Sequence, residues 1–412
     1  MTLVTIDGIA AGGEGVGRMP DGRVVFVSRT SPGDVVEVVE VEAKPRYVRA
    51  RVVALKTPGP DRVDPSCVHY TREGCGGCQL QHLSPGAQLR AKQRVVGDAL
   101  RRIAGLRIDD PDIVASPDPW RYRSMITLNA RTTPHGQGRR FGLHLFSRSG
   151  GVFEPTDCLI TRERVMQLWA RVRNHGSLFP LGAESLTLRE DRDGGLHVVF
   201  AGGAPPWDPD PLVRAVGDHE LSFWWRPVGG AARVMAGPRT GFPALAFEQS
   251  NPALADTIRR EAVATLGAVD GEVVWDLYGG VGDTAALLAG RGATAWSVDE
   301  DRAAKEWAAR RTPERVKHIT GRVEVVLQQL DEPVAVVVNP PRAGMVRRVT
   351  QHLDRWGAAR AGRVLAYISC DPATLARDIS RLTAFSVRRV VAYDLFPQTS
   401  HVETLAVLES AS

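Results

Sequence analysis

One cysteine of the sequence stands where a reactive thiol would be expected. Cys370 directly follows the apolar run 365–368, which has the composition of a buried strand. Asp371 and Pro372 come next, and proline is typical of the first turn of a helix. Because that turn carries a partial positive charge, the position predicts a thiol with a lowered pKa, which favours the thiolate. A lone cysteine is more often an inert core residue, but the place of this one at a strand end favours a nucleophile.

A carboxylate further along the chain could serve as the base that such a nucleophile needs. Glu403 lies in the apolar run 402–408, after the polar turn 397–400. A charged side chain in an apolar strand costs free energy unless it has a partner or a function. On the pattern alone, an exposed glutamate on an edge strand is an equally good interpretation. Together with Cys370, however, Glu403 would complete the nucleophile and general base of a covalent mechanism.

A glycine-rich loop, Gly279–Gly282, joins the apolar strand 273–278 to a helix that begins near Thr284. Its glycines let the backbone turn tightly and approach a ligand closely. Asp276 opens the motif, where its carboxylate could meet a ligand ammonium group. Asp299 ends the next strand, where ribose hydroxyls would lie. Dinucleotide-binding and methyltransferase sheets both carry such a loop, and a purely structural turn is the third interpretation.

Two further polar segments follow strands that come later in the chain. Asn339–Arg342 comes after the apolar run 334–338, and Ser369–Asp371 comes after the run 364–368. The carboxyl ends of parallel strands meet at one edge of a sheet, where open α/β sheets bind their ligands. We therefore expect these segments to line one ligand site together with the glycine loop and Asp299.

Four of the five cysteines lie in the first half of the sequence, namely Cys67, Cys75, Cys78 and Cys158. An odd total and the lack of a secretory signal pattern argue against a disulfide framework. Metal binding or nucleophilic chemistry is the better use for such thiols. Without a signal pattern or an apolar run long enough to span a bilayer, the expected location is the cytoplasm.

The composition, with 43% hydrophobic and 24% charged residues, is that of an ordinary globular protein. The length of 412 residues fits two or three domains. The formal net charge of +5 says little about partners. Residues 84–150, however, hold twelve Lys and Arg against five Asp and Glu. This local excess makes contact with a nucleic acid as good an interpretation as a solvated basic surface.

The strand and helix patterns divide the chain into parts. Residues 1–56 alternate apolar and polar in short runs between Gly and Pro turns, which predicts a small β-barrel. A linker at 57–62, a cysteine-containing segment and a helix from Pro85 to about Ala104 follow. Strand-like runs with Gly-rich turns over residues 112–241 predict a mainly β central domain.

From Gly271 onward strands alternate with helices, which predicts a parallel sheet flanked by helices. The last two strand runs, 387–393 and 402–408, are joined by a turn without a helix, so the last strand should be antiparallel. The fold class is therefore α/β, with a β-barrel and a mainly β domain before the α/β domain. The expected domains are 1–57, 58–245 and 246–412.

Taken together, the motifs resemble the family of S-adenosylmethionine-dependent RNA (uracil-5-)-methyltransferases that carry an N-terminal TRAM domain, an OB-like RNA-binding barrel. The resemblance covers almost the whole chain, and it is most specific in the nucleophile and base motifs. The matching segments are Ala10–Arg18 and Pro32–Asp34 for TRAM, Phe247–Asn251 for the glutamine motif, Tyr367–Leu375 for the nucleophile motif and Phe396–Glu403 for the base motif.

The resemblance implies a class I (Rossmann-like) methyltransferase domain that methylates C5 of a uridine in RNA. Cys370 would add to C6 of the uracil, and Glu403 would remove the C5 proton. RNA is the implied partner, with ribosomal RNA favoured over transfer RNA, and the protein is expected to be a monomer that binds no membrane. The implied S-adenosylmethionine contacts are Gln249, Tyr278, Asp283, Asp299, Arg322 and Asn339, and the implied [4Fe–4S] ligands are Cys67, Cys75, Cys78 and Cys158.

The sequence departs from the family pattern in three places. Seven residues separate Cys67 from Cys75, which is more than is usual between the first two cluster ligands. Asn339 stands where the family has an aspartate, so an amide replaces a carboxylate on the cofactor side. Gly279 stands where a cysteine is common, and we expect this change to be harmless.

Two other functions remain open. Asn339–Pro341 is typical of methyltransferases that act on amino groups, but Arg342 occupies the place of the aromatic residue that follows in such enzymes. Those enzymes also need neither Cys370 nor Glu403. A non-enzymatic RNA-binding or redox-sensing protein could be built from a TRAM barrel and a cluster. Binding of S-adenosylmethionine would separate that alternative from an enzyme.

Overall fold

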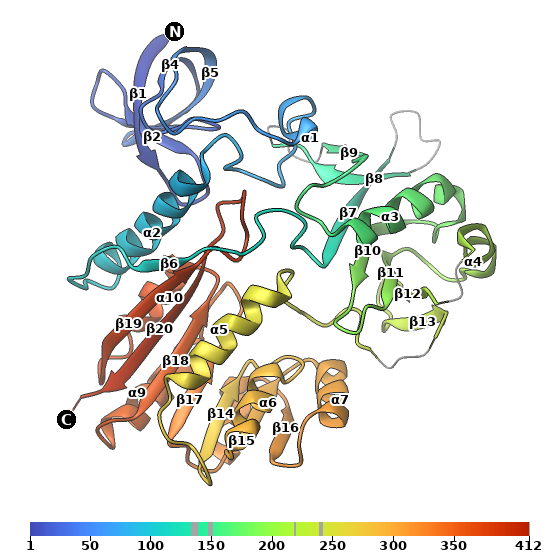
Figure 1. The fold of residues 1–412 in the computed structure, drawn as a ribbon, viewed down its shortest axis with the longest axis vertical. Helices are drawn as coiled ribbons and strands as arrows, with labels where there is room; N and C mark the ends of the chain where they lie inside the picture. Colours follow the sequence, from blue (N-terminus) through green and yellow to red (C-terminus); the bar gives the residue numbers. More distant parts are fainter. Residues whose placement is uncertain (133–138, 147–150, 218–219, 239–241, 412) are drawn as a thin grey trace.

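The computed structural model describes residues 1–132, 139–146, 151–217, 220–238 and 242–411. Three sheets organise the chain: a closed N-terminal barrel, a seven-stranded central sheet and an eight-stranded C-terminal sheet (Figure 1). Within the described ranges, no helix has the length and the apolar composition that crossing a membrane requires.

The barrel is built from strands in which apolar residues alternate with polar ones, as the sequence predicts. Val4, Ile6, Val25, Val36 and Val48 lie in its interior and are almost fully buried. Neighbouring strands are antiparallel except β3 and β5, which are parallel. The strands are β1 (Thr2–Ile9), β2 (Gly15–Arg18), β3 (Val24–Val27), β4 (Val35–Ala43) and β5 (Tyr47–Thr57), in the closed order β1-β2-β3-β5-β4.

A cysteine-containing segment and a helix connect the barrel to the rest of the chain. The short α1 (Val68–Thr71) lies in that segment, and α2 (Pro85–Arg102) confirms the predicted helix. Ser84 caps α2, because its side chain accepts a hydrogen bond from the Ala87 N–H. The helix packs against α10 (Pro372–Ile379), so the N-terminal half of the chain contacts the C-terminal sheet.

The central domain is mainly β, as predicted. Its strands are antiparallel except for the parallel pair β11 and β12. Trp169, Phe200 and Trp225 are fully buried in its core. The sheet runs β13 (Arg233–Ala236), β12 (Ser222–Arg226), β11 (Leu196–Gly202), β10 (Ala183–Glu190), β7 (Met125–Thr132), β8 (Arg139–His144) and β9 (Val152–Phe153), and its helices are α3 (Glu163–Val172), η1 (Arg173–Leu178) and α4 (Asp210–Val216).

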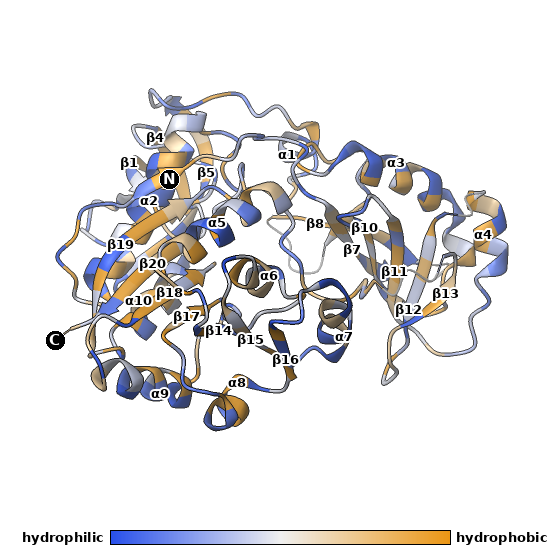
Figure 2. Ribbon diagram, turned by 60° about the horizontal axis from the view of Figure 1, so that its bottom comes forward, coloured by the Kyte–Doolittle hydropathy of each residue, from blue (hydrophilic) through white to orange (hydrophobic). Residues whose placement is uncertain are grey.

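The C-terminal sheet confirms the predicted α/β fold. Five neighbouring strands are parallel, and β20 is antiparallel to both of its neighbours. Strands β18 and β20 are largely apolar along their length (Figure 2). The sheet runs β16 (Val316–Thr320), β15 (Thr294–Asp299), β14 (Val273–Leu277), β17 (Ala335–Val338), β18 (Val364–Ser369), β20 (Glu403–Ser410), β19 (Phe385–Tyr393) and β6 (Asp112–Val114).

Helices cover this sheet in the way that strand–helix alternation predicts. Besides α10, they are α5 (Pro252–Ala264), α6 (Asp283–Gly290), α7 (Arg302–Arg311), α8 (Val323–Val326), η2 (Leu327–Gln329) and α9 (Arg347–Ala358).

Two strands of the sheet were not predicted from the sequence. β16 is partly exposed, and β6 has three residues, too few to show a periodic pattern. β6 pairs in parallel with β19, where Val391 lies opposite Asp112. The C-terminal sheet therefore takes its edge strand from the segment 58–245, and the central domain follows that strand in the sequence.

Candidate active site

A cavity of about 840 Å³ opens at the carboxyl ends of the parallel strands. Residues that follow β14, β15, β16, β17 and β18 line it, together with the segments around Phe247 and His401. Every predicted catalytic and cofactor residue except Asp283 lines it. These residues are Gln249, Tyr278, Asp299, Arg322, Asn339, Cys370 and Glu403.

Cys370 and Glu403 lie at neighbouring positions at the ends of two paired strands. Ser369 of β18 pairs with Thr404 of β20. The next residues outward on these antiparallel strands are Cys370 and Glu403, so their side chains are neighbours at the edge of the cavity.

Glu403 is fully buried, and neither carboxyl oxygen has a hydrogen-bond partner among the described residues. Burial raises the pKa of Glu403 to about 8, although Arg259 and Arg342 act in the opposite direction. At neutral pH the carboxyl group is therefore mainly protonated. The interpretation of Glu403 as an exposed edge residue is wrong, because β20 lies between β18 and β19.

The predicted lowering of the pKa of Cys370 is also wrong. Burial of the thiol and the nearby Glu403 raise its pKa, and Arg342 opposes them. Cys370 lies one residue before the cap of α10, and the cap residue Asp371 places its own carboxylate on the Thr374 N–H at 2.8 Å. Burial and Glu403 thus outweigh the effect of the helix N-terminus on the pKa of Cys370, and the Asp371 carboxylate adds a smaller contribution.

The residues that line the cavity also include Phe247, Arg342 and His401, which were not predicted as site residues. Arg342 is the cation that favours the charged forms of both Cys370 and Glu403. Burial lowers the pKa of His401 to about 4, so its ring is neutral at pH 7. All three belong to the quoted motifs, which was the signal that could have identified them.

Hydrogen bonds and backbone conformation hold the glycine loop at the cavity in a fixed shape. Asp299 accepts hydrogen bonds from the N–H groups of Gly280 (2.8 Å) and Asp301 (2.9 Å). Tyr278 and Gly280 have positive φ angles of 62° and 48°. A Cβ atom at Gly279 would lie 2.2 Å from the Asp276 carboxylate, so this loop needs a glycine there.

Asp276 does not contact the cavity, and the expectation that it meets a ligand ammonium group is wrong. The residue is fully buried, and its carboxylate accepts a hydrogen bond from the Ser297 hydroxyl at 2.8 Å. Lys305 donates to the same hydroxyl at 2.7 Å. Burial raises the pKa of Asp276, and Lys305 acts against that shift. Asp283 also lies outside the cavity, where it pairs with arginines.

The loop before Glu403 is held by residues that are distant in the sequence. The Gln88 side chain donates to Oε1 of Gln398 at 3.0 Å, and the Gln398 N–H donates to Oε1 of Gln88 at 3.0 Å. The Gln398 carbonyl accepts hydrogen bonds from the N–H groups of Gln79 and Leu80. Helix α2 and the segment after Cys78 therefore fix the approach to Glu403.

The four remaining cysteines, Cys67, Cys75, Cys78 and Cys158, line one small pocket. Burial, with a smaller contribution from neighbouring thiols, raises the pKa of Cys75 to about 11 and that of Cys78 to about 12. Across the described residues, no three His, Cys, Asp or Glu side chains are arranged to hold a metal ion. The structure thus brings the thiols to one pocket without supporting a metal centre, and the [4Fe–4S] cluster stays a prediction.

Raising the pH from about 5 to 8 is expected to destabilise the wild-type protein relative to a Glu403→Gln variant. The folded protein holds the Glu403 proton up to about pH 8, whereas the ordinary pKa is 4.5. Over this range the unfolded chain binds fewer protons, so the free energy of unfolding falls as pH rises. At pH 7 the loss is on the order of 3 kcal/mol. Thermal unfolding of both proteins at several pH values measures it, and a difference that stays constant with pH would contradict the prediction.

Comparison with known proteins agrees with this fold. Residues 308–411 match the family model described as tRNA (Uracil-5-)-methyltransferase, and residues 2–53 match the TRAM domain. The solved structure of the Pyrococcus abyssi tRNA (uracil-54, C5)-methyltransferase in complex with S-adenosyl-L-homocysteine has the same fold. Its TM-score is 0.69 at 23% identity, over 98% of this chain and 99% of that chain.

Two relatives match along nearly their whole length. An uncharacterised RNA methyltransferase of Streptomyces coelicolor is 33% identical, over 99% of this chain and 93% of the relative. The 23S rRNA (uracil(1939)-C(5))-methyltransferase RlmD of Thiobacillus denitrificans is 30% identical, over 96% of this chain and 97% of the relative. The chain therefore belongs to the family of RNA (uracil-5-)-methyltransferases.

Proposed function

We propose that the protein methylates C5 of one uridine in RNA, with Cys370 as nucleophile and Glu403 as general base. The observation that carries this proposal is the buried Glu403 carboxyl group, which lines the cavity without a hydrogen-bond partner in the described part of the chain. Such a group costs stability, and groups with a strongly shifted pKa gather where proton transfer is needed. The neighbouring Cys370 thiol supplies the nucleophile.

The proposed binding site of S-adenosylmethionine is the glycine-loop side of the cavity. Asp299, oriented by two backbone N–H groups, would accept hydrogen bonds from ribose hydroxyls. The Asn339 amide offers both a donor and an acceptor, so it can still contact the cofactor or the uracil. When bound, S-adenosylmethionine supplies a methyl group on a positively charged sulfur. The proposed contacts are Gln249, Tyr278, Asp299, Arg322 and Asn339.

In the proposed reaction the Cys370 thiol gives its proton to water, and the resulting thiolate adds to C6 of the uracil. The C–S bond forms as the C5–C6 π bond breaks, and its electrons give an enolate. C5 of the enolate then takes the methyl group, and the departing sulfur keeps the electron pair of the broken bond. Glu403 in its ionised form, which Arg259 and Arg342 favour, removes the C5 proton, after which the ring double bond reforms and the thiolate leaves. Arg342 would assist by favouring the charged forms of both residues.

Ribosomal RNA is the proposed substrate, supported by the name of the RlmD relative, while the TRAM barrel supports RNA as the partner. Mass mapping of 5-methyluridine in RNA from cells with and without the gene tests this. Loss of one 5-methyluridine from 23S ribosomal RNA, restored by the wild-type gene but not by Cys370→Ala, is the expected result. Loss from transfer RNA alone would assign the other substrate, and no loss at all would contradict the proposed activity.

We also propose that Cys67, Cys75, Cys78 and Cys158 hold a [4Fe–4S] cluster, because the structure gathers these thiols in one buried pocket. Protein purified without oxygen should be brown and contain about four irons per chain. A Cys78→Ser variant should lose most of the iron, whereas Cys370→Ser should keep it, since Cys370 lines the other cavity. Tightly bound zinc without iron in the wild-type protein would contradict this assignment.

A further inference from the structure

A group of ion pairs joins the central domain to two walls of the active-site cavity. It lies at the tip of the hairpin formed by β10 and β11, around residues 189–195. The group consists of three arginines and three carboxylates that alternate in space. They are Arg189, Arg192 and Arg259, with Glu248, Asp256 and Asp283.

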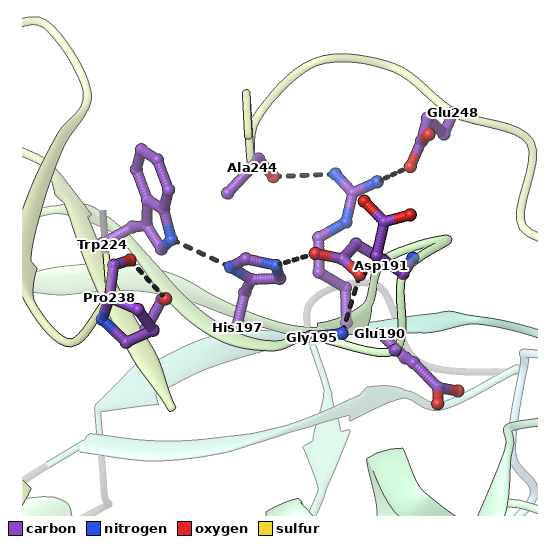
Figure 3. Close-up of polar contacts among 12 residues, drawn as sticks. Glu190, Asp191, Gly195, His197, Trp224, Pro238, Ala244 and Glu248 are labelled. Carbon is purple, nitrogen blue, oxygen red and sulfur yellow. Dashed lines mark hydrogen bonds and ion pairs between the residues drawn. The ribbon is translucent and has the colours of Figure 1, made fainter. Parts of the chain in front are cut away.

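Buried hydrogen bonds hold the tip of this hairpin in shape. The Asp191 carboxylate accepts a hydrogen bond from the Gly195 N–H at 2.7 Å and contacts the buried His197 ring at 2.8 Å. Trp224 donates to the other nitrogen of that ring at 3.1 Å, so His197 lies between the two side chains (Figure 3). Arg192 directly follows Asp191, so these hydrogen bonds also hold the backbone from which the Arg192 side chain extends.

Arg189 holds the first wall of the cavity, which is the segment that contains Gln249. Its buried guanidinium group donates to the carbonyl oxygens of Ala244 (2.8 Å) and Ala246 (3.2 Å) and pairs with the Glu248 carboxylate. Figure 3 shows Ala244 and Glu248 on the strand-free segment that faces the hairpin. Gln249, which lines the cavity, is the next residue. Arg189 thus attaches the glutamine motif to the central sheet.

Arg259 of α5 holds the second wall of the cavity, which is the glycine loop. It pairs with Asp256 at 2.7 Å and with Asp283 at 3.3 Å. Asp283 is the first residue of α6 and directly follows the glycine loop Gly279–Gly282. The position of the loop therefore depends on where Asp283 is held.

Arg192 contacts carboxylates of both walls. Its Nε lies 3.5 Å from Glu248, and its Nη2 lies 3.2 Å from Asp256 and 2.8 Å from Asp283. A single side chain of the central domain thereby links the residue before Gln249 to the residue after the glycine loop.

We propose that Arg192 is a positioning residue that sets the separation between Gln249 and the glycine loop, and so the affinity of the cavity for S-adenosylmethionine. This inference rests on the proposed function, because both walls are taken to hold the cofactor. Without Arg192, Glu248 still has Arg189 and Asp283 still has Arg259. Each wall keeps its own ion pair, while the link between the walls is lost.

Arg192 suits a test by substitution because its side chain is 34% exposed, so its replacement leaves no buried cavity. An Arg192→Gln variant should bind S-adenosylmethionine about tenfold more weakly in calorimetry, with kcat at saturating cofactor within about threefold of wild type. Arg192→Lys keeps a charge that can reach one carboxylate at a time and should show an intermediate affinity.

Arg164→Gln is the matched control. Arg164 pairs with Glu190 and donates to the Gly194 carbonyl at 3.1 Å, so it contacts the same hairpin but neither wall. The affinity of the Arg164→Gln variant for S-adenosylmethionine should equal that of the wild-type protein. Unchanged affinity in Arg192→Gln, an equal loss in Arg164→Gln, or a fall in kcat alone would overturn the inference. A wild-type protein that does not bind S-adenosylmethionine would instead contradict the proposed function itself.

Discussion

A Glu403→Gln variant is expected to methylate its RNA once and then remain covalently bound to it. Glutamine keeps the shape of the side chain but cannot accept the C5 proton. Without that step the bond between Cys370 and C6 cannot break, so turnover should fall by about 10²- to 10⁴-fold. The trapped protein–RNA adduct should survive a denaturing gel and carry radiolabel from the methyl group of S-adenosylmethionine.

The control for this variant is Glu261→Gln, the same chemical change at a carboxylate outside the cavity. Glu261 pairs with Arg389 and accepts a hydrogen bond from the Tyr393 hydroxyl. It should turn over normally and leave no adduct. If Glu403→Gln also turned over normally, or if its adduct lacked the methyl label, Glu403 would not be the base that removes the C5 proton.

A Cys370→Ala variant is expected to lose activity by at least about 10⁴-fold, because alanine has no thiol that could add to C6. Production of 5-methyluridine, measured by mass spectrometry, should be near background. Binding of S-adenosylmethionine should stay at the wild-type level, which separates loss of chemistry from loss of folding.

The same substitution also tests the order of the steps. In the double variant with Glu403→Gln no adduct should form, because the bond to C6 precedes methyl transfer in the proposed reaction. An adduct that formed without Cys370, or activity within about a hundredfold of wild type, would mean that another residue is the nucleophile.

The sequence predicted that Cys370 and Glu403 would act together as nucleophile and base, and the pairing of β18 with β20 places these two residues next to each other. The pKa of Cys370 could not be predicted in the same way. The helix-dipole argument uses only the residues beside Cys370, whereas burial and Glu403 act through the tertiary structure. The residues beside Cys370 in the sequence indicate that a helix begins there. They do not indicate that the Glu403 carboxyl group lies near the thiol in the folded protein.

Asp276 and the edge strand β6 show the same limit. A carboxylate at a strand end can point either to the ligand or into the sheet, and Ser297 and Lys305 decide that for Asp276. β6 is recognised only by its pairing with β19. The Arg192 ion pairs were missed for a related reason, because their partners lie on segments that are far apart in the sequence.

The strand order of the C-terminal sheet has a consequence for synthesis on the ribosome. β20 lies between β18 and β19 but is made after both. Until β20 is made, the edge of the apolar strand β18 therefore stays unpaired, and such an edge is the kind of surface on which partly folded chains aggregate. β20 also begins with Glu403. Closing the sheet and delivering the proposed base are thus one event, so an unfinished polypeptide would lack the group proposed to release a methylated RNA.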